Sequence, residues 1–490
     1  MRSLIKKFIS TEQVLNNYDL YNGTDRENSF KMNLKSDFLP ENQKTFSLSY
    51  FLIPLNKDLI LYKKDEEKFF YDNLFVEKDK EIFYPFFVHP ETVEMFVAWI
   101  NGKYEFIDEA ESIYDATPTS SFRSLIVTNK KTNVKFIAKV SLFDNVANGA
   151  RHIDWSSASG QYLSSQIVCN TVDNINNLNF FEDIAAFGIT ADRALFLSNR
   201  FRVLIGDRRI KTLANVIRKL PEDFDRESFN RVCSIASFSS PVLEKESYIY
   251  KAWKNSKLSY LNFLDKYIFK PIKDILLKLI QEHGIVLESH CQNMMLELDE
   301  SYLPTGRFYY RDFDITSFDR ARFPFIHTKE WLEYCKVGQN RTTLSSNMAM
   351  REYIGMSFLF HFIDNLIWPC VRYGTLGKII SESKGNKFIA DKYKEMKNEV
   401  LSLCPLADET FRKKNEKWPY FKGTLKNIAL SEVPVKLTKL NENIDLEKDY
   451  EKIIVGKPIY SGIDYYKTHC GLIIAANKDN IFEIFNIKTE

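Results

Sequence analysis

The sequence predicts an α+β protein that is divided into several folded regions. Its 490 residues exceed what one hydrophobic core normally organises. Hydrophobic residues make up 44% and charged residues 27%, a composition typical of a folded globular chain. Helical periodicity and short β-branched runs occupy separate stretches, without an internal repeat. We therefore predict a helix-rich region over residues 1–100, a sheet-containing region over 101–225 and a large α+β region over 226–490.

The first two regions differ in local pattern. In the first, helical spacing is interrupted by charged runs such as residues 63–68, which we expect to be solvated turns. In the second, short segments rich in β-branched residues are predicted to be strands, at 124–128, 135–142 and 166–168. Thr132 and Asn133 are the predicted hairpin turn between the first two of these strands.

The third region is predicted to combine helices with a polar segment. Helical periodicity covers residues 250–281, 347–371 and 386–403, and the polar segment occupies 285–315. Residues 353–371 have the length of a membrane span, but this stretch contains His361, Asp364 and Asn365. Polar groups are costly inside a bilayer, so we expect a buried helix here and no membrane span.

Charge and cysteine content narrow the class of protein. Lys and Arg total 67 against 65 Asp and Glu, so the net charge of +2 creates no field that attracts nucleic acid or an anionic membrane. The seven cysteines are scattered and odd in number, which is typical of reduced thiols and indicates the cytoplasm. The start of the chain lacks the apolar segment of a signal peptide.

Common nucleotide and hydrolase motifs are missing from the sequence. The run from Gly374 to Lys378 lacks the spacing and the final hydroxyl of a phosphate-binding loop. No segment matches the dinucleotide glycine pattern, the G-x-S-x-G elbow or the H-E-x-x-H zinc helix. Any anion site must therefore be assembled from other residues.

The most informative stretch is E-S-H-C-Q-N at residues 288–293, because apolar residues flank it on both sides. Polar side chains in such a setting are costly unless they are paired, which often marks a site. If the segment is extended, Glu288, His290 and Gln292 share one face. The alternative, which we favour for any one residue taken alone, is that His290, Gln292 and Asn293 satisfy backbone groups in a buried hairpin.

The same stretch, together with the R-D pair at residues 311–312, offers oxygen ligands. Oxygens of Glu288, Asn293 and Asp312 suit magnesium, which normally keeps phosphate oxygens among its ligands. Zinc is the weaker alternative, because His290 and Cys291 are adjacent and no second pair lies at finger spacing.

The middle region carries a second candidate cluster, which suits a polyanion. Hydroxyls of Ser121 and Ser124, the fork of Arg123 and the charges of Lys139 and Arg151 could together hold a triphosphate without a glycine loop. The alternative is that these cations are exposed residues of ordinary strands.

In combination, the two clusters resemble the NRPS-independent siderophore (NIS) synthetases, the IucA/IucC-like family. The family's S-x-R-T element is matched by S-F-R-S at 121–124, and its E-A-H-x-Q-N element by residues 288–293. Its strand lysine and an arginine twelve residues later are matched by Lys139 and Arg151, and its R-D element by residues 311–312. The four elements occur in the family's order, and the resemblance runs from about residue 89 to residue 314.

The resemblance implies a three-lobed hand, with a helical thumb, a sheet-bearing fingers domain and a large palm, and with ATP between fingers and palm. It implies an AMP-forming ligase that uses ATP and Mg²⁺ to adenylate a carboxylate of citrate or a related polycarboxylate. A polyamine, an amino acid or a hydroxylated nucleophile then displaces AMP, giving an amide or ester for siderophore biosynthesis and iron acquisition. A homodimer is the expected assembly.

The resemblance also implies roles for individual residues. Charge stabilisation in catalysis is expected from His290, Arg123, Lys139 and Arg151. The residues expected to contact the nucleotide are Ser121, Arg123, Ser124, Lys139, Arg151, His290 and Gln292. Glu288, Asn293 and Asp312 are expected to bind the magnesium ion.

The chain departs from the family pattern at several places. Ala147 replaces a threonine that lies near the substrate acid, which leaves the identity of the acid open. Of the family's H-P-x-H-P element only the second half is present, as His89-Pro90. These departures keep a non-catalytic binding or partner protein as an alternative. A kinase-like phosphotransferase, which would release ADP, is a third interpretation.

Overall fold

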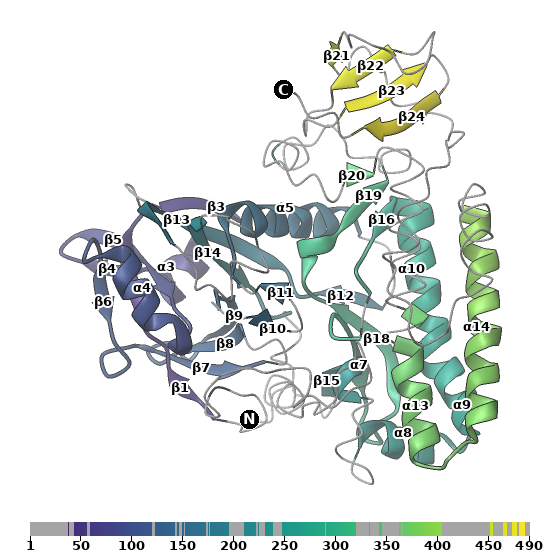
Figure 1. The fold of residues 1–490 in the computed structure, drawn as a ribbon. Coiled ribbons are helices and arrows are strands. Elements are labelled where there is room, and N and C mark those ends of the chain that lie inside the picture. Colours follow the sequence, from purple (N-terminus) through teal and green to yellow (C-terminus); the bar gives the residue numbers. More distant parts are fainter. Residues whose placement is uncertain are drawn as a thin grey trace.

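The computed structural model describes the chain in segments. These are residues 38, 44–55, 59–119, 123–142, 145–146, 149–150, 152–172, 175, 177–195, 210–221, 224, 231–238, 247–289, 291–319, 333, 343–344, 362–363, 366–403, 451–453, 464–467, 473–477 and 480–485. Within them, several sheets are combined with helices, as the α+β prediction required. The helices of residues 248–283 and 368–403 lie together on one side of the molecule, whereas the helices of residues 67–73, 93–100 and 155–171 lie against the sheets of the first half (Figure 1).

A seven-stranded antiparallel sheet organises the first half of the chain. In spatial order its strands are β1 (Phe46–Ser47), β7 (Tyr114–Pro118), β8 (Ser124–Asn129), β9 (Lys135–Lys139), β14 (Ile210–Arg218), β13 (Asp183–Leu195) and β3 (Leu59–Lys63). The strands predicted at 124–128 and 135–142 are confirmed, and Asn133 takes the positive φ of 58° that their hairpin turn needs. β-branched and aromatic residues fill these strands because they pack well on a pleated surface.

A smaller four-stranded sheet packs beside the first one. It consists of β4 (Val76–Lys78), β5 (Glu81–Phe87), β2 (Tyr50–Pro54) and β6 (Glu105–Ile107). The helices of this part are short: α3 (Glu67–Asn73), η3 (Pro90–Thr92) and α4 (Val93–Ile100). The prediction of a helix-rich region is therefore wrong for residues 44–100, because aromatic strand residues here bury against a neighbouring sheet.

One hydrophobic core spans the predicted boundary at residue 100. Strands β1 and β3 pair with β7 and β13, so the beginning of the chain contributes both edges of the large sheet. Residues on both sides of the boundary, from Leu48 to Ile217, share one buried cluster in which Tyr84 stacks on Phe187 with ring centroids 3.7 Å apart. The charged run 63–68 forms the end of β3 and the start of α3, consistent with the expected turn.

Helix α5 (Trp155–Thr171) covers the face of the large sheet opposite that core. Asp154 caps it by accepting a hydrogen bond from the Ser157 N–H at 2.7 Å. Gly188 of β13 makes room for the Trp155 ring, which would lie 2.5 Å from a Cβ at that position. The strand predicted at 166–168 is wrong, since these residues lie in this helix, where burial on nearly all sides removes the amphipathic pattern.

A third sheet begins the second half of the molecule. Its order is β12 (Leu178–Phe180), β18 (Pro304–Tyr310), β17 (Met294–Leu298) and β15 (Arg231–Ser234), with β12 and β18 parallel. A small sheet of β16 (Ile285–Val286), β19 (Ser317–Asp319) and β20 (Thr343–Leu344) lies at one end, and the single turn η7 (Phe313–Ile315) precedes β19. Strands β10 (Asn145–Val146) and β11 (Gly149–Ala150) pair with each other, and β21 (Glu451–Ile453), β22 (Asp464–Lys467), β23 (Ile473–Asn477) and β24 (Asn480–Phe485) form a separate sheet near the C-terminus.

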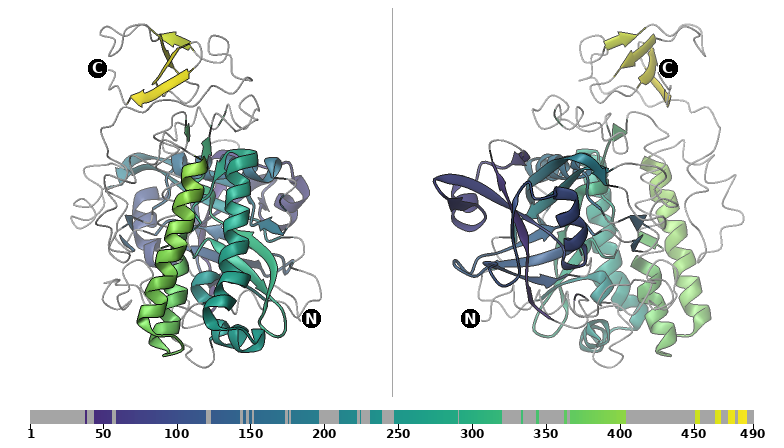
Figure 2. Two further views of the ribbon diagram at one scale, coloured as in Figure 1. Left: turned by 90° about the vertical axis from the view of Figure 1, so that its right-hand side faces the viewer. Right: turned by 60° about the vertical axis from the view of Figure 1, so that its left-hand side comes forward.

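Helices cover the outer side of the third sheet. They are α7 (Ile235–Phe238), α8 (Tyr248–Ser256), α9 (Tyr260–Leu264), the π-helical turn η6 (Asp265–Phe269), α10 (Lys270–His283), α13 (Trp368–Leu376) and α14 (Glu382–Leu403). The helices predicted at 250–281 and 386–403 are confirmed. Helix α14 runs alongside α10 (Figure 2), where Lys273 pairs with Glu395 and Glu399 at 2.6 and 2.7 Å.

The remaining predictions for this half concern the stretch 347–371. Residues 347–361 lie outside the described part, whereas Val371 lies in α13 and is buried. Gly374 serves packing, because a Cβ there would lie 2.4 Å from the Tyr260 ring. Among the helices that the structure describes, none has both the length and the apolar character needed to cross a membrane.

Candidate functional site

The candidate site lies where the large sheet meets the loop that follows β18. Lys139, the last residue of β9, is 4% exposed and directs its ammonium group toward this junction. Its Nζ donates hydrogen bonds of 2.7 Å to Asp312 Oδ1 and to Gln161 Oε1 of α5. Lys139 and Asp312 are separated by 173 residues in the sequence, so the two predicted clusters meet in space.

A fully buried ion pair completes this arrangement. Arg218, at the end of β14, donates from Nε to Asp183 Oδ1 at 2.7 Å and from Nη2 to Asp183 Oδ2 at 3.3 Å. Gln161 Nε2 donates to Asp183 Oδ2 at 2.8 Å, and Arg218 Nη2 lies 3.8 Å from Asp312 Oδ1. The contacts therefore form a closed circuit, which we call the buried ring: Lys139, Gln161, Asp183, Arg218 and Asp312. Its first four members are buried, whereas the Asp312 side chain is 28% exposed and forms the side of the ring that is open to solvent.

The buried ring controls the charge of its carboxyl groups. Burial by itself would raise the pKa of Asp312, but Lys139, Arg218 and, more weakly, Arg123 outweigh it and hold that pKa well below its usual value. Burial raises the pKa of Asp183, with Arg218 and Gln161 opposing the change. Asp312 is therefore a fully ionised carboxylate at neutral pH.

The backbone at Asp312 is unusual. Its φ of 75° and ψ of 85° are positive, a region that L-residues other than Asn and Asp seldom occupy. The Asp312 carbonyl accepts a hydrogen bond from the Tyr310 hydroxyl at 3.1 Å. Such a conformation costs on the order of 1–3 kcal/mol and is found preferentially at functional sites. Here it turns the carboxylate toward Lys139.

The segment around residues 288–293 is a loop, so the extended conformation that would align Glu288, His290 and Gln292 is wrong for the described residues. The physical reason is strand pairing: β16 pairs with β19, whereas β17 pairs with β18, and the polar residues cross between these sheets. Asn293 Nδ2 donates to the Glu288 carbonyl at 3.4 Å. Arg311 fastens the loop to β18, since its Nε donates to the Gln292 carbonyl at 3.3 Å.

Glu288 lies within electrostatic reach of the same junction. Burial, followed by the charges of Glu288 and Asp312, raises the pKa of the Tyr310 hydroxyl well above its usual value. Both acids are therefore near this phenol, and Asn293 is held close to Glu288 by the bond above. Glu288 is half-buried and Asn293 is buried.

Of the residues predicted to contact phosphate, Ser124 and Lys139 face each other. They are register partners in the β8–β9 pair, and cross-strand partners share one face of a sheet. Arg123 is half-buried and donates from Nη1 to the His152 carbonyl at 3.4 Å. Ser121, Arg151 and His290, like Ala147, lie outside the described residues, so their predicted roles stay predictions.

A magnesium ion suits the chemistry of the donors that the fold brings together. Glu288, Asn293 and Asp312 offer carboxylate and amide oxygens, to which a bound polyphosphate would add its own. The described residues contain no cluster of three or more His, Cys, Asp and Glu side chains, so a closed cage of such ligands is not found among them. Cys291, the neighbour of His290 in the sequence, is buried, and burial raises the pKa of its thiol to about 12.

His89, from the incomplete histidine-proline element, has a structural role. It is buried, and its Nδ1 accepts a hydrogen bond from the Glu91 N–H at 3.2 Å at the start of η3. Burial lowers its pKa to about 4, so the imidazole is neutral at physiological pH.

Three members of the buried ring were missed from the sequence: Gln161, Asp183 and Arg218. Asp183 is separated from an aromatic pair by Glu182 and begins an apolar strand, while Arg218 ends one. A charged residue at the end of an apolar strand is common. The signal for an ion pair was therefore only that the two strand ends carry opposite charges, Asp183 on one and Arg218 on the other. Gln161 lies within a helix and offered no signal at all.

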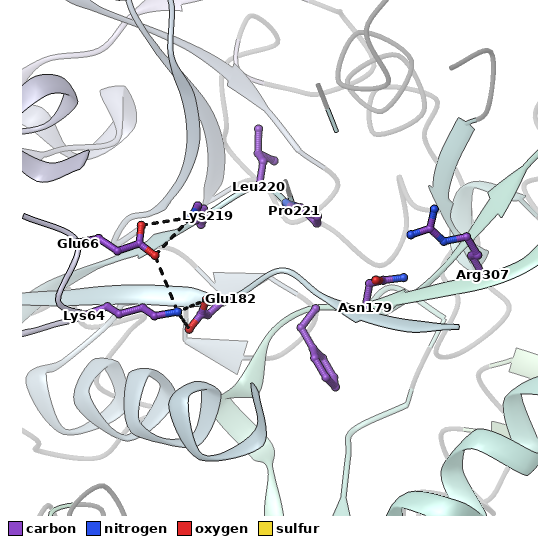
Figure 3. Close-up of a pocket in the computed structure, with 9 residues that line it drawn as sticks. Lys64, Glu66, Asn179, Glu182, Lys219, Leu220, Pro221 and Arg307 are labelled. Atoms are coloured by element: carbon purple, nitrogen blue, oxygen red, sulfur yellow. Dashed lines mark hydrogen bonds and ion pairs between the residues drawn. The ribbon is translucent and has the colours of Figure 1, made fainter. Parts of the chain in front are cut away.

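An open pocket, drawn in Figure 3, is lined by Glu182 and Lys219, which are the sequence neighbours of Asp183 and Arg218 of the buried ring. It has a volume of about 420 Å³ and is lined by Lys64, Glu66, Asn179, Phe180, Glu182, Lys219, Leu220, Pro221 and Arg307. Lys64 Nζ lies 2.9 Å from Glu182 Oε1, and Lys219 Nζ lies 3.2 Å from Glu66 Oε2. We call this feature the charged pocket.

Comparison with known families gives one partial match. A family model described as ferric iron reductase FhuF-like transporter matches residues 266–344. This range includes the loop that carries Glu288 and Asn293 and continues past Asp312, but it covers far less than half of the chain. No curated protein matches the sequence.

Solved structures share the fold over most of the chain. ATP-bound aerobactin synthetase IucA from a hypervirulent pathotype of Klebsiella pneumoniae aligns with a TM-score of 0.58 at 13% identity, covering 83% of this chain and 72% of that one. Petrobactin biosynthesis protein AsbB from Bacillus anthracis str. Sterne gives 0.57 at 16%, covering 84% and 68%. Aerobactin synthetase IucC from the same Klebsiella pathotype gives 0.55 at 16%, covering 88% and 76%. These proteins are NIS synthetases, so the resemblance predicted from the motifs is confirmed in the fold.

Proposed function

We propose that this protein is an ATP-dependent, AMP-forming synthetase that activates a carboxylate of citrate or a related polycarboxylate and joins it to an amine or alcohol in siderophore biosynthesis. One observation carries the proposal: Ser124, Lys139 and Asp312, from separate predicted motifs, converge at one junction. They do so in a fold that is similar to ATP-bound IucA.

The proposed reaction has two steps. A carboxylate oxygen of the acid attacks the α-phosphorus of ATP, and the bond from that phosphorus to the bridging oxygen breaks, which releases pyrophosphate. The amine nitrogen or hydroxyl oxygen then attacks the acyl carbon, and AMP leaves while the nucleophile loses one proton. Both steps spread negative charge over phosphoryl oxygens, so fixed cations stabilise them.

We assign each site residue a part in binding the phosphates and stabilising their charge, according to its chemistry. Lys139 supplies a point charge and Arg123 a planar fork for phosphate oxygens, and Ser124 supplies a hydroxyl. Arg151, Ser121, His290 and Gln292 are proposed to add further donors to the phosphates. Glu288, Asn293 and Asp312 would hold a magnesium ion, which neutralises charge on the triphosphate when bound.

The lobes of the family are proposed to correspond to particular sheets. The seven-stranded sheet with α5 would form the fingers, and the β12–β18–β17–β15 sheet with its outer helices the palm. Asp312 follows a strand of the second sheet, whereas Lys139 ends a strand of the first. The nucleotide would therefore lie between them.

Product analysis tests the proposal. Purified protein is incubated with ATP, magnesium, hydroxylamine as a trapping nucleophile, and a panel of citrate, 2-oxoglutarate, succinate and malate. AMP and pyrophosphate should form with one acid, and Lys139→Met should lose this activity. Lys135→Met, four residues earlier in β9, where the lysine bonds Thr128, is the matched control and should keep it.

Other products would identify the alternative functions. ADP in place of AMP would indicate a phosphotransferase and exclude adenylation. ATP binding without turnover of any acid would favour the non-catalytic binding or partner protein, for which Ala147 and the incomplete His89-Pro90 element are the motivating departures.

A further inference from the structure

The buried ring carries an inference about how the site exchanges partners. Its five residues come from β9, α5, β13, β14 and the turn after β18. The ring contains two cations and two carboxylates, so its formal charges cancel. A polyanion that approaches a ring of zero net charge gains little electrostatic attraction unless one of these pairs opens.

The two cations beside Asp312 are held in different ways. Arg218 is locked, since two of its nitrogens bond Asp183 and its side chain is 3% exposed. It lies 3.8 Å from Asp312, too far for a hydrogen bond. Lys139 makes the short contact of 2.7 Å, through a flexible stem that ends in three donors. Lys139 is therefore the cation that can change partners.

Gln161 makes such an exchange feasible. Its amide oxygen accepts from Lys139 at 2.7 Å, while its amide nitrogen donates to Asp183 at 2.8 Å. The neighbouring charges fix this orientation, because the oxygen must face the ammonium group and the nitrogen the carboxylate. The ammonium group thus keeps one neutral partner on α5 if its bond to Asp312 opens.

We propose that Asp312 masks Lys139 until a polyphosphate arrives, and that Lys139 then passes from Asp312 to the phosphate. The proposal rests on the proposed function, because it takes ATP as the polyphosphate. Arg218 stays in place and keeps a positive charge beside Asp312 during the exchange. The released carboxylate is then available to magnesium, so nucleotide and metal favour each other's binding at this site.

We call this pairing of Asp312 with Lys139 the mask. If it exists, removal of the Asp312 charge should tighten ATP binding, whereas removal of a merely structural residue should not. Asp312→Asn keeps the size of the side chain but removes the charge that competes for Lys139. Metal-free ATP, measured by calorimetry with excess EDTA, should bind about tenfold more tightly to this variant than to the wild type, equivalent to about 1.4 kcal/mol. Added magnesium should improve ATP affinity less in the variant than in the wild type.

Asp314→Asn is the matched control. Asp314 lies two residues further along and bonds the Ser157 hydroxyl at 3.4 Å, outside the buried ring. Its neutralisation removes the same charge from nearly the same place, so a general field effect would tighten ATP binding in both variants. Unchanged metal-free affinity in the control, beside tighter binding in Asp312→Asn, supports the mask; equal tightening in both contradicts it.

The remaining outcomes separate this inference from the proposed function. Weaker metal-free binding in Asp312→Asn, with normal binding in the wild type, overturns the mask alone. If Asp312→Asn and Asp312→Ser both fail to fold, the Asp312 carboxylate is required for folding and the mask is wrong. Absence of ATP binding in the wild type overturns both proposals, whereas tighter binding in the variant without AMP formation by the wild type overturns only the synthetase.

Discussion

The buried ring and the charged pocket are built from neighbouring residues of the same strand ends, yet they have different surroundings. Asp183 and Arg218 belong to the ring, whereas Glu182 and Lys219, next to them in sequence, line the pocket. The side chains of Arg218 and Asp183 are 3% and 0% exposed, and those of Lys219 and Glu66 are 30% and 22% exposed. Residues that are adjacent in sequence, on either side of a strand end, thus form ion pairs in environments of different dielectric.

The difference between the ring and the pocket indicates which charged residues are suited to bind a ligand or to stabilise a transition state. In the pocket, water and salt screen each ion pair. Each pair therefore contributes little to stability, and its rearrangement costs little free energy. In the ring, Lys139, Asp183 and Arg218 are buried, so removal of the partner of any of these three leaves a charge uncompensated away from water, whereas Asp312 is 28% exposed. Ordered charges of this kind can be exchanged for those of a ligand, which supports the candidate site at the ring rather than in the pocket.

The largest expected effect comes from breaking the locked pair of the ring. Arg218→Met leaves Asp183 buried without its guanidinium partner and should destabilise the protein by about 3–5 kcal/mol. Lys219→Met, at the adjacent position in the charged pocket, should change stability by about 0.5 kcal/mol or less. Urea unfolding of the two variants checks this contrast, and similar losses in both would show that the two environments do not differ as described.

A buried histidine, outside both the ring and the pocket, extends the comparison of buried and exposed groups to the pH dependence of stability. The folded pKa of His89 is about 4, below its unfolded value of about 6.5, so the unfolded chain binds the proton more readily. Stability should therefore be full above about pH 6.5 and fall toward pH 4, by up to about 3 kcal/mol from this group. Urea unfolding across this range should show the slope in the wild type and a smaller slope in His89→Gln.

The comparison of the wild type with His89→Gln decides this prediction. A slope that persists unchanged in His89→Gln would assign it to other groups.

A smaller effect is expected at Gln161, which links the two halves of the ring. Gln161→Met removes the acceptor of Lys139 and a donor to Asp183, and should cost about 1–3 kcal/mol of stability. Gln166→Met is the comparison, because that side chain bonds Glu182 of the charged pocket and the Asp183 carbonyl. Thermal unfolding measures the stability cost of each substitution. ATP affinity separates the two variants, because only Gln161→Met should weaken ATP binding.

The smallest effect belongs to the charged pocket itself. A double-mutant cycle on Lys64 and Glu182, with Lys64→Met and Glu182→Gln, should give a coupling energy below about 1 kcal/mol. The coupling should decrease in about 1 M salt, where the screening length is short. A coupling of several kcal/mol that resists salt would mean that the pocket behaves like the ring.

The sequence by itself determined the local structure and the chemical types at the site. Short runs rich in β-branched residues predicted β8 and β9, and helical spacing predicted the helices at 250–281 and 386–403, because such patterns act over a few residues. Lys139 and Asp312 were identified by their motifs. Helix α5 and the strands of residues 44–100 were misread, since burial on several sides removes the periodicity on which local prediction depends.

Only the tertiary structure decided which charges meet. Lys139 bonds Asp312 across 173 residues, and Arg218 bonds Asp183 across 35, and no local pattern encodes either contact. Tertiary packing also assigned Asp183, the first residue of β13, to the ring and Glu182, the residue before that strand, to the pocket. The physical reason is that a charge takes its chemical character from its partners and its distance from water, and both are set by long-range packing.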